Sequence, residues 1–116
     1  MGDTKQQLWV DANNKPALIG TGFEAGETAC PVANEPVKLL PEGTETLSVV
    51  IVADASNTTA VNIGNIGVHP SNNPGLQIAI GASISLDLDN SKQPIYIATA
   101  TAADKVSWLF IKGKNI

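Results

Sequence analysis

The fold is decided by residues 76–88, which read LQIAIGASISLDL. Apolar residues alternate on both sides of Gly81, and the residues between them after this glycine are serine and aspartate. Strict alternation of apolar and polar residues is typical of a half-buried β-strand, and a glycine between two such runs indicates a hairpin. The stretch therefore predicts a hairpin with one face in a core. Its polar face would consist of Ser83, Ser85, Asp87 and Asp89.

Further strands are expected on both sides of this hairpin. Residues 46–53 are apolar on both faces, which is typical of a central strand. Shorter apolar segments bounded by turn residues occur at 37–40, 60–63, 95–98 and 106–111. We therefore expect an all-β protein, a single β-sandwich or Greek-key barrel of about seven short strands.

The first 35 residues have a different pattern from the rest of the chain. Glycine, proline and asparagine recur there so often that no helix is expected. We therefore divide the chain into an N-terminal arm or irregular segment, residues 1–35, and a β-sandwich or barrel domain, residues 36–116. Very short strands within the first part remain an alternative. Large apolar residues with little apolar company are typical of interface anchors, and the expected partner-contact residues are Leu8, Trp9, Val10 and Phe23.

Composition limits the class of protein. The chain has 116 residues, of which 43% are hydrophobic and 16% charged, as expected of one globular domain. It contains no arginine, and its seven lysines are scattered over a chain of net charge −4. Nucleic-acid binding normally requires a basic patch, so no nucleic-acid partner is expected.

Targeting signals give no support for a membrane or an exported location. No apolar run approaches the roughly 20 residues of a membrane-spanning helix. The N-terminus lacks the basic and apolar regions of a signal peptide. We therefore expect no membrane partner, and synthesis in a cytoplasm.

The candidate reactive residues do not form a recognisable motif. His69 is the only histidine and lies in a loop rich in proline and asparagine, without a nucleophile motif nearby. Cys30 is the only cysteine, so neither a disulfide nor a thiolate zinc site can form within the chain. Starting from Asp87, the sixth and twelfth positions hold Lys92 and Ala98, where a calcium loop needs glycine and glutamate. We expect no catalytic, cofactor-binding or metal-binding residues, and no enzymatic activity.

The second half of the chain resembles a small β-domain of tailed-bacteriophage virion structural proteins. The resemblance covers residues 45–112. The motifs that carry it are a turn at Ser56-Asn57-Thr58, the segment Val61-x-Ile63-Gly64-x-x-Gly67-Val68, the hairpin Gly81-x-Ser83-Ile84-Ser85-Leu86-Asp87-Leu88, and Ile95-Tyr96. These motifs are structural, so the resemblance transfers no catalytic residue.

The resemblance implies a capsid decoration (cement) protein on the outside of a phage head. Such a protein would be oligomeric, would bind the major capsid protein, and would be found on the virion after assembly in the host cytoplasm. Two other roles remain open, a phage tail or fibre adaptor and a glycan-binding module on the virion surface. A small hydrolase is a third, less favoured class.

Overall fold

The structure is a computed structural model that describes the backbone of residues 18–115 and the side chains of residues 22–113. Residues 18–115 form eight β-strands and no helix. The strands are β1 (Leu18–Ala29), β2 (Val37–Lys38), β3 (Ser48–Ala53), β4 (Val61–Gly64), β5 (Leu76–Ile78), β6 (Ser83–Leu86), β7 (Tyr96–Thr99) and β8 (Lys105–Asn115).

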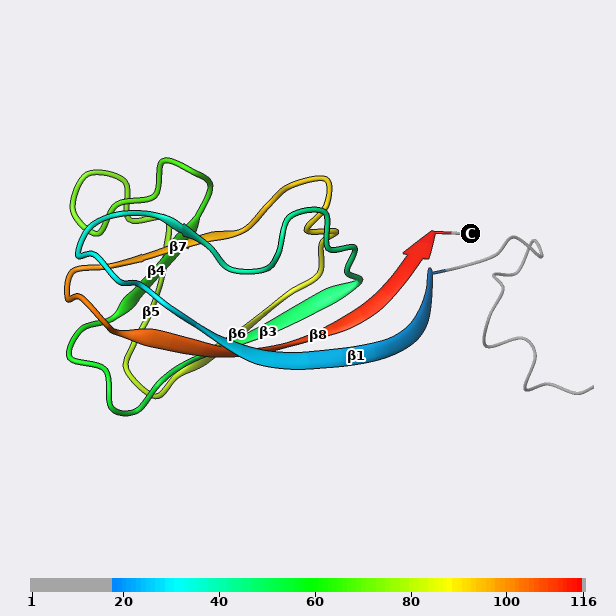
Figure 1. The fold of residues 1–116 in the computed structure, drawn as a ribbon, viewed down its shortest axis with the longest axis horizontal. Helices are drawn as coiled ribbons and strands as arrows, with labels where there is room; N and C mark the ends of the chain where they lie inside the picture. The colour runs from blue at the N-terminus through cyan, green and yellow to red at the C-terminus, as the bar shows by residue number, and fades with distance from the viewer. Residues whose placement is uncertain (1–17, 116) are drawn as a thin grey trace, which may run out of the picture.

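The strands form two four-stranded antiparallel sheets. One has the order β1-β8-β3-β6 and the other β2-β7-β4-β5. Figure 1 shows the two sheets as separate layers, with the far ends of β1 and β8 curving away beyond the second sheet. The expected all-β sandwich is thus confirmed.

Apolar side chains, most of them aliphatic, fill the space between the sheets. Buried members of this core come from both layers: Cys30, Leu39, Leu40, Val49, Ile51, Ala53, Val61, Ile63, Ile78, Ile95, Ile97, Val106 and Phe110. The alternation in β3 explains its orientation, because Val49 and Ile51 are fully buried while Val50 and Val52 are exposed. The expected central position of this strand is confirmed, since β3 lies between β8 and β6.

The expected hairpin of residues 76–88 is wrong. β5 pairs with β4 in one sheet, and β6 pairs with β3 in the other. The chain crosses between the sheets at residues 79–82, where Gly81 has a φ of 79°. Hydrogen bonds from Gly81 N to Ala53 O (3.0 Å) and from Ala53 N to Ala82 O (2.9 Å) fix this turn to the end of β3. Alternation predicts which face of a strand is buried, but it does not identify the strand's partner.

The expected division of the chain at residue 35 does not hold for residues 18–35. β1 pairs with β8 from Leu18 opposite Asn115 to Ala29 opposite Lys105, so it belongs to the sandwich. The glycines that suggested an irregular segment have places within this strand. The register shifts between Gly20 and Gly22, as in a β-bulge, which a strand can contain without ending.

Candidate functional site

The most distinctive surface of the molecule is the outer face of the β1-β8-β3-β6 sheet. Because side chains alternate along a strand, every second residue of these strands points away from the core. Several of these residues are apolar. The exposed fractions are 65% for Phe23, 37% for Val50, 37% for Val52 and 36% for Leu109.

Strand register brings these residues together. Leu109 of β8 lies between Ala25 of β1 and Val50 of β3. Phe23 lies opposite Ile111, a half-buried residue of β8 on the same face. We call this surface the apolar outer face, and define it by Phe23, Ala25, Val50, Val52, Leu109 and Ile111.

Small hydroxyl side chains border the apolar outer face. Ser83 and Ser85 of β6 lie opposite Val52 and Val50, and Ser107 of β8 lies on the other side of Val52. An apolar centre with a polar border is the usual composition of a protein–protein interface. Contiguous apolar surface on a soluble domain commonly marks such an interaction site.

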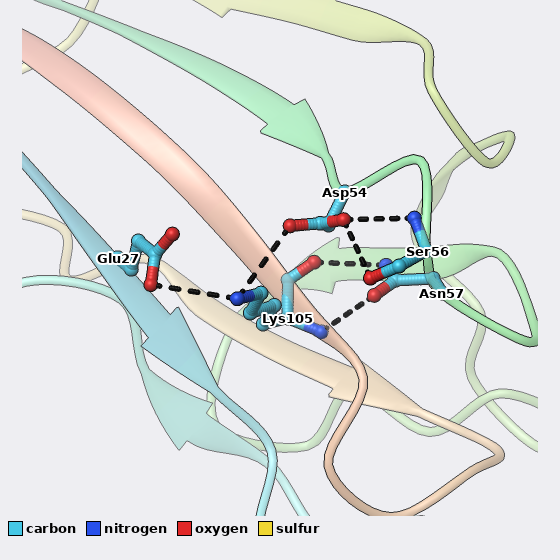
Figure 2. A network of polar contacts seen from close by, with 5 residues as sticks. All are labelled: Glu27, Asp54, Ser56, Asn57 and Lys105. Carbon is cyan, nitrogen blue, oxygen red and sulfur yellow. Dashed lines mark hydrogen bonds and ion pairs between the residues drawn. The ribbon is translucent and has the colours of Figure 1, made fainter.

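A charged cluster lies at one end of this face (Figure 2). Lys105 Nζ is 3.6 Å from Glu27 Oε1 and 3.7 Å from Asp54 Oδ2. Hydrogen bonds from the Ser56 amide (2.8 Å) and hydroxyl (2.7 Å), together with Lys105, hold the pKa of Asp54 below its usual value. Such exposed ion pairs contribute little to stability, but they give this end of the face both signs of charge.

Asn57 attaches the loop after β3 to the start of β8. Its side-chain amide donates to Lys105 O (2.8 Å), and its Oδ1 accepts from Lys105 N (2.8 Å), as Figure 2 shows. Both contacts are made to the backbone, so they fix the position of Lys105 whatever its side chain does.

The buried carboxylate of Asp104 completes this attachment. It accepts hydrogen bonds from the amides of Thr58 (3.0 Å) and Thr59 (2.9 Å) and from the Thr59 hydroxyl (2.9 Å). Burial acts to raise the pKa of Asp104, but these hydrogen bonds outweigh it and hold the pKa below its usual value. The group is therefore a structural anion.

A groove of about 510 Å³ lies on the opposite, inner side of the same sheet. The ends of β1 and β8 form one wall, and the loop after β2 forms the other. Its lining residues are Glu24, Pro41, Thr44, Glu45, Trp108, Phe110, Lys112 and Gly113. The rings of Trp108 and Phe110 stack with centroids 5.6 Å apart.

Of the expected partner-contact residues, the structure describes only Phe23. It is on the apolar outer face and does not pack into the core. Leu8, Trp9 and Val10 lie outside the described residues. Sequence reasoning did not identify Val50, Val52 and Leu109 as exposed. For Val50 and Val52 the reason is that a strand with apolar residues on both faces suggested burial of both. Ser83 and Ser85, which lie opposite Val52 and Val50, are the residues of the sequence that indicate a solvent-facing side.

Cys30 and His69, the reactive residues considered in the sequence, each have their own local surroundings. Cys30 is buried, and burial raises the pKa of its thiol. His69 is half-buried in its loop, where Nδ1 accepts hydrogen bonds from the amides of Ser71 (3.0 Å) and Asn72 (3.2 Å). Among the described residues, no three His, Cys, Asp or Glu side chains gather as a metal site would require.

The two aspartates expected on the polar face of residues 83–89 have different environments. Asp87 is exposed, as expected. Asp89 is half-buried, and its Oδ1 accepts from the Ser91 hydroxyl (2.8 Å) and amide (3.0 Å). The Ser91 hydroxyl is the main cause that lowers the pKa of Asp89. Asp89 therefore stabilises a turn and is not a free surface charge.

Within residues 18–115, no helix has the length and apolarity to cross a membrane. Comparison of the chain with protein-family models, with curated proteins and with solved structures finds no match.

Proposed function

We propose that this protein is a non-enzymatic structural component of a tailed-bacteriophage virion, a capsid decoration protein that binds the outside of the head. In this role it stabilises the contacts between neighbouring major capsid subunits. The observation that carries the proposal is the apolar outer face, an exposed apolar surface on a four-stranded sheet. The resemblance of residues 45–112 to phage virion domains supplies the kind of partner.

The apolar outer face can contribute part of the free energy of binding to a head. Burying apolar surface is favourable by roughly 25 cal/mol per Å², whereas a stable complex commonly buries about 800 Å² on each partner. A few half-exposed side chains provide only part of that area. Binding to the assembled head still stabilises it by mass action, because a ligand that binds only the assembled state favours that state.

The charge distribution suits docking without electrostatic steering. The apolar outer face contains no charged side chain, and at its end Glu27 and Asp54 both pair with Lys105. Binding through this face should therefore change little with ionic strength, unlike association that depends on opposite charges.

Copy number on purified virions tests this role. Quantitative mass spectrometry should find on the order of hundreds of copies per particle, because a decoration protein is repeated over the head lattice. Heads assembled without the protein should lose DNA or break at a lower temperature, and adding the purified protein should restore their stability. A dozen copies or fewer would instead indicate the neck, tail or fibre, and absence from the virion would reject a structural role.

A further inference from the structure

The groove on the inner side of the β1-β8 sheet contains an aromatic surface that its neighbours hold in place. Trp108 lies over Gly26 of β1: a Cβ built on Gly26 would be 2.7 Å from Cζ2 of the indole. The Trp108 Nε1–H donates to Thr28 Oγ1 (2.9 Å), which fixes the orientation of the ring. Stacking with Phe110 supports it further along the groove. These contacts hold the indole in one position, where it lines the groove.

Polar groups surround this aromatic surface. Lys112 Nζ is 3.2 Å from Glu24 Oε2, and both side chains are about half exposed, at 45% and 56%. Glu45 and Thr44 approach from the opposite wall. The groove thus offers carboxylate acceptors, one ammonium donor and one hydroxyl group beside an aromatic ring. A few polar groups directed at an apolar surface are typical of small-ligand sites, which commonly enclose about 300–1,000 Å³.

We propose that this groove is a binding site for a neutral glycan. A sugar ring has an apolar face of C–H groups that stacks on an aromatic ring, and hydroxyl groups around its edge that both donate and accept. The groove supplies the matching partners, Trp108 for the apolar face and Glu24, Glu45 and Lys112 for the hydroxyl groups. This site is on the opposite side of the sheet from the apolar outer face, so it does not depend on the proposed docking role.

The charges of the groove favour neutral over acidic sugars. Two carboxylates, Glu24 and Glu45, line it against one ammonium group, Lys112, which is already paired with Glu24. The net charge of −4 also opposes an anionic ligand. Sialylated and uronic-acid sugars should therefore bind more weakly than neutral sugars of the same size.

Nuclear magnetic resonance titration of the full chain tests the proposal. The probes are neutral trisaccharides (maltotriose, cellotriose and triacetylchitotriose) and acidic ones (sialyllactose and trigalacturonic acid), each at millimolar concentration. A Trp9→Phe background leaves Trp108 as the only tryptophan, since the chain has two. At least one neutral sugar should shift the Trp108 indole N–H and the amides of Lys112 and Gly113 saturably. Val50 and Val52, the outer-face residues of β3, do not line the groove and should not shift.

Rim variants separate binding from folding. Trp108→Ala should abolish the shifts, but it can also disturb the packing over Gly26. Glu45→Lys changes an exposed residue and should reduce affinity several-fold with the melting temperature unchanged, while Lys92→Met, an exposed change elsewhere, should have no effect. The proposal is overturned if no neutral sugar shifts these signals, if the shifts occur elsewhere, if the acidic sugars bind equally well, or if Glu45→Lys leaves the affinity unchanged.

Discussion

At the scale of single residues, Asp104 connects electrostatics to stability. Asp104 is 5% exposed, and its carboxylate accepts hydrogen bonds from Thr58 and Thr59. The attachment of the loop between β3 and β4 to the start of β8 therefore depends on the charge of Asp104. Because the pKa of Asp104 is lowered in the folded protein, its contribution to stability is complete above the unfolded-state pKa of about 3.9. That contribution is lost as pH falls through the lower, folded-state pKa.

Asp104→Asn should therefore reduce the free energy of unfolding at pH 7 by about 1–3 kcal/mol. The reason is that asparagine has one acceptor oxygen where the carboxylate has two, so one of the N–H donors in the loop loses its acceptor. The variant should also lose less stability than the parent when the pH is lowered from 5 to about 2. Urea unfolding across this range measures both effects. Asp87→Asn, an exposed aspartate, is the control and should behave as the parent. Equal acid sensitivity of Asp104→Asn and the parent would contradict the assignment.

Gly75 is required by both its backbone conformation and its surroundings. Its φ is 59°, and a Cβ added there would be 2.3 Å from the carbonyl oxygen of Ile63. Gly43 provides a matched control, because its φ is also positive (79°) but nothing lies within 4 Å of an added Cβ. Gly43→Ala should cost about 1–2 kcal/mol from the left-handed backbone alone. Gly75→Ala should cost clearly more, as measured by thermal or urea unfolding. Equal losses would show that β4 can move to accommodate a methyl group.

At the scale of strands, the part that the sequence predicts well is the orientation of each face. Alternation predicted that Ser83, Ser85 and Asp87 face solvent, and all three are exposed. It could not identify the partners of β5 and β6, because a turn of a few residues can connect strands within one sheet or between two. That turn is fixed by contacts with Ala53, which are distant in sequence.

β1 was missed as a strand for a related reason. Glycine generally weakens the interior of a strand. In β1, however, Gly26 leaves the space in which Trp108 packs, and Trp108 is 82 positions later in the chain. The candidate sites were equally inaccessible to sequence reasoning. The exposure of Val50 and the groove beside Trp108 both depend on which surface the second sheet covers.

Truncation tests the role of β1. All eight described strands begin after residue 17, so deleting residues 1–17 should leave a soluble protein that melts cooperatively. Deleting residues 1–35 removes β1 and the buried Cys30, and exposes the edge of β8 and the side of Trp108. This longer deletion should abolish cooperative melting or solubility. Calorimetry and circular dichroism distinguish the two variants, and a stable domain lacking residues 1–35 would show that β1 is dispensable.

At the scale of the whole molecule, one sheet presents two different surfaces. Its outer face is apolar and uncharged at the centre, and its inner face continues past the second sheet to form the groove. Among residues 18–115, the far ends of β1 and β8 pair only with each other beyond Ile111, where β3 begins. A two-stranded ribbon has marginal stability on its own. The paired ends of β1 and β8, which form one wall of the groove, therefore depend on the rest of the sheet for their stability.

The central claim is that the apolar outer face docks on the head, and affinity for heads assembled without this protein tests it most directly. Val50→Lys places a charge at the centre of this face, whereas Ile66→Lys makes the same kind of change at a residue that is 69% exposed in the loop after β4. In a sedimentation assay, Val50→Lys should weaken binding at least tenfold, equivalent to about 1.4 kcal/mol. Ile66→Lys should bind as the parent does, and both variants should melt at similar temperatures. Full binding by a folded Val50→Lys protein would contradict the account.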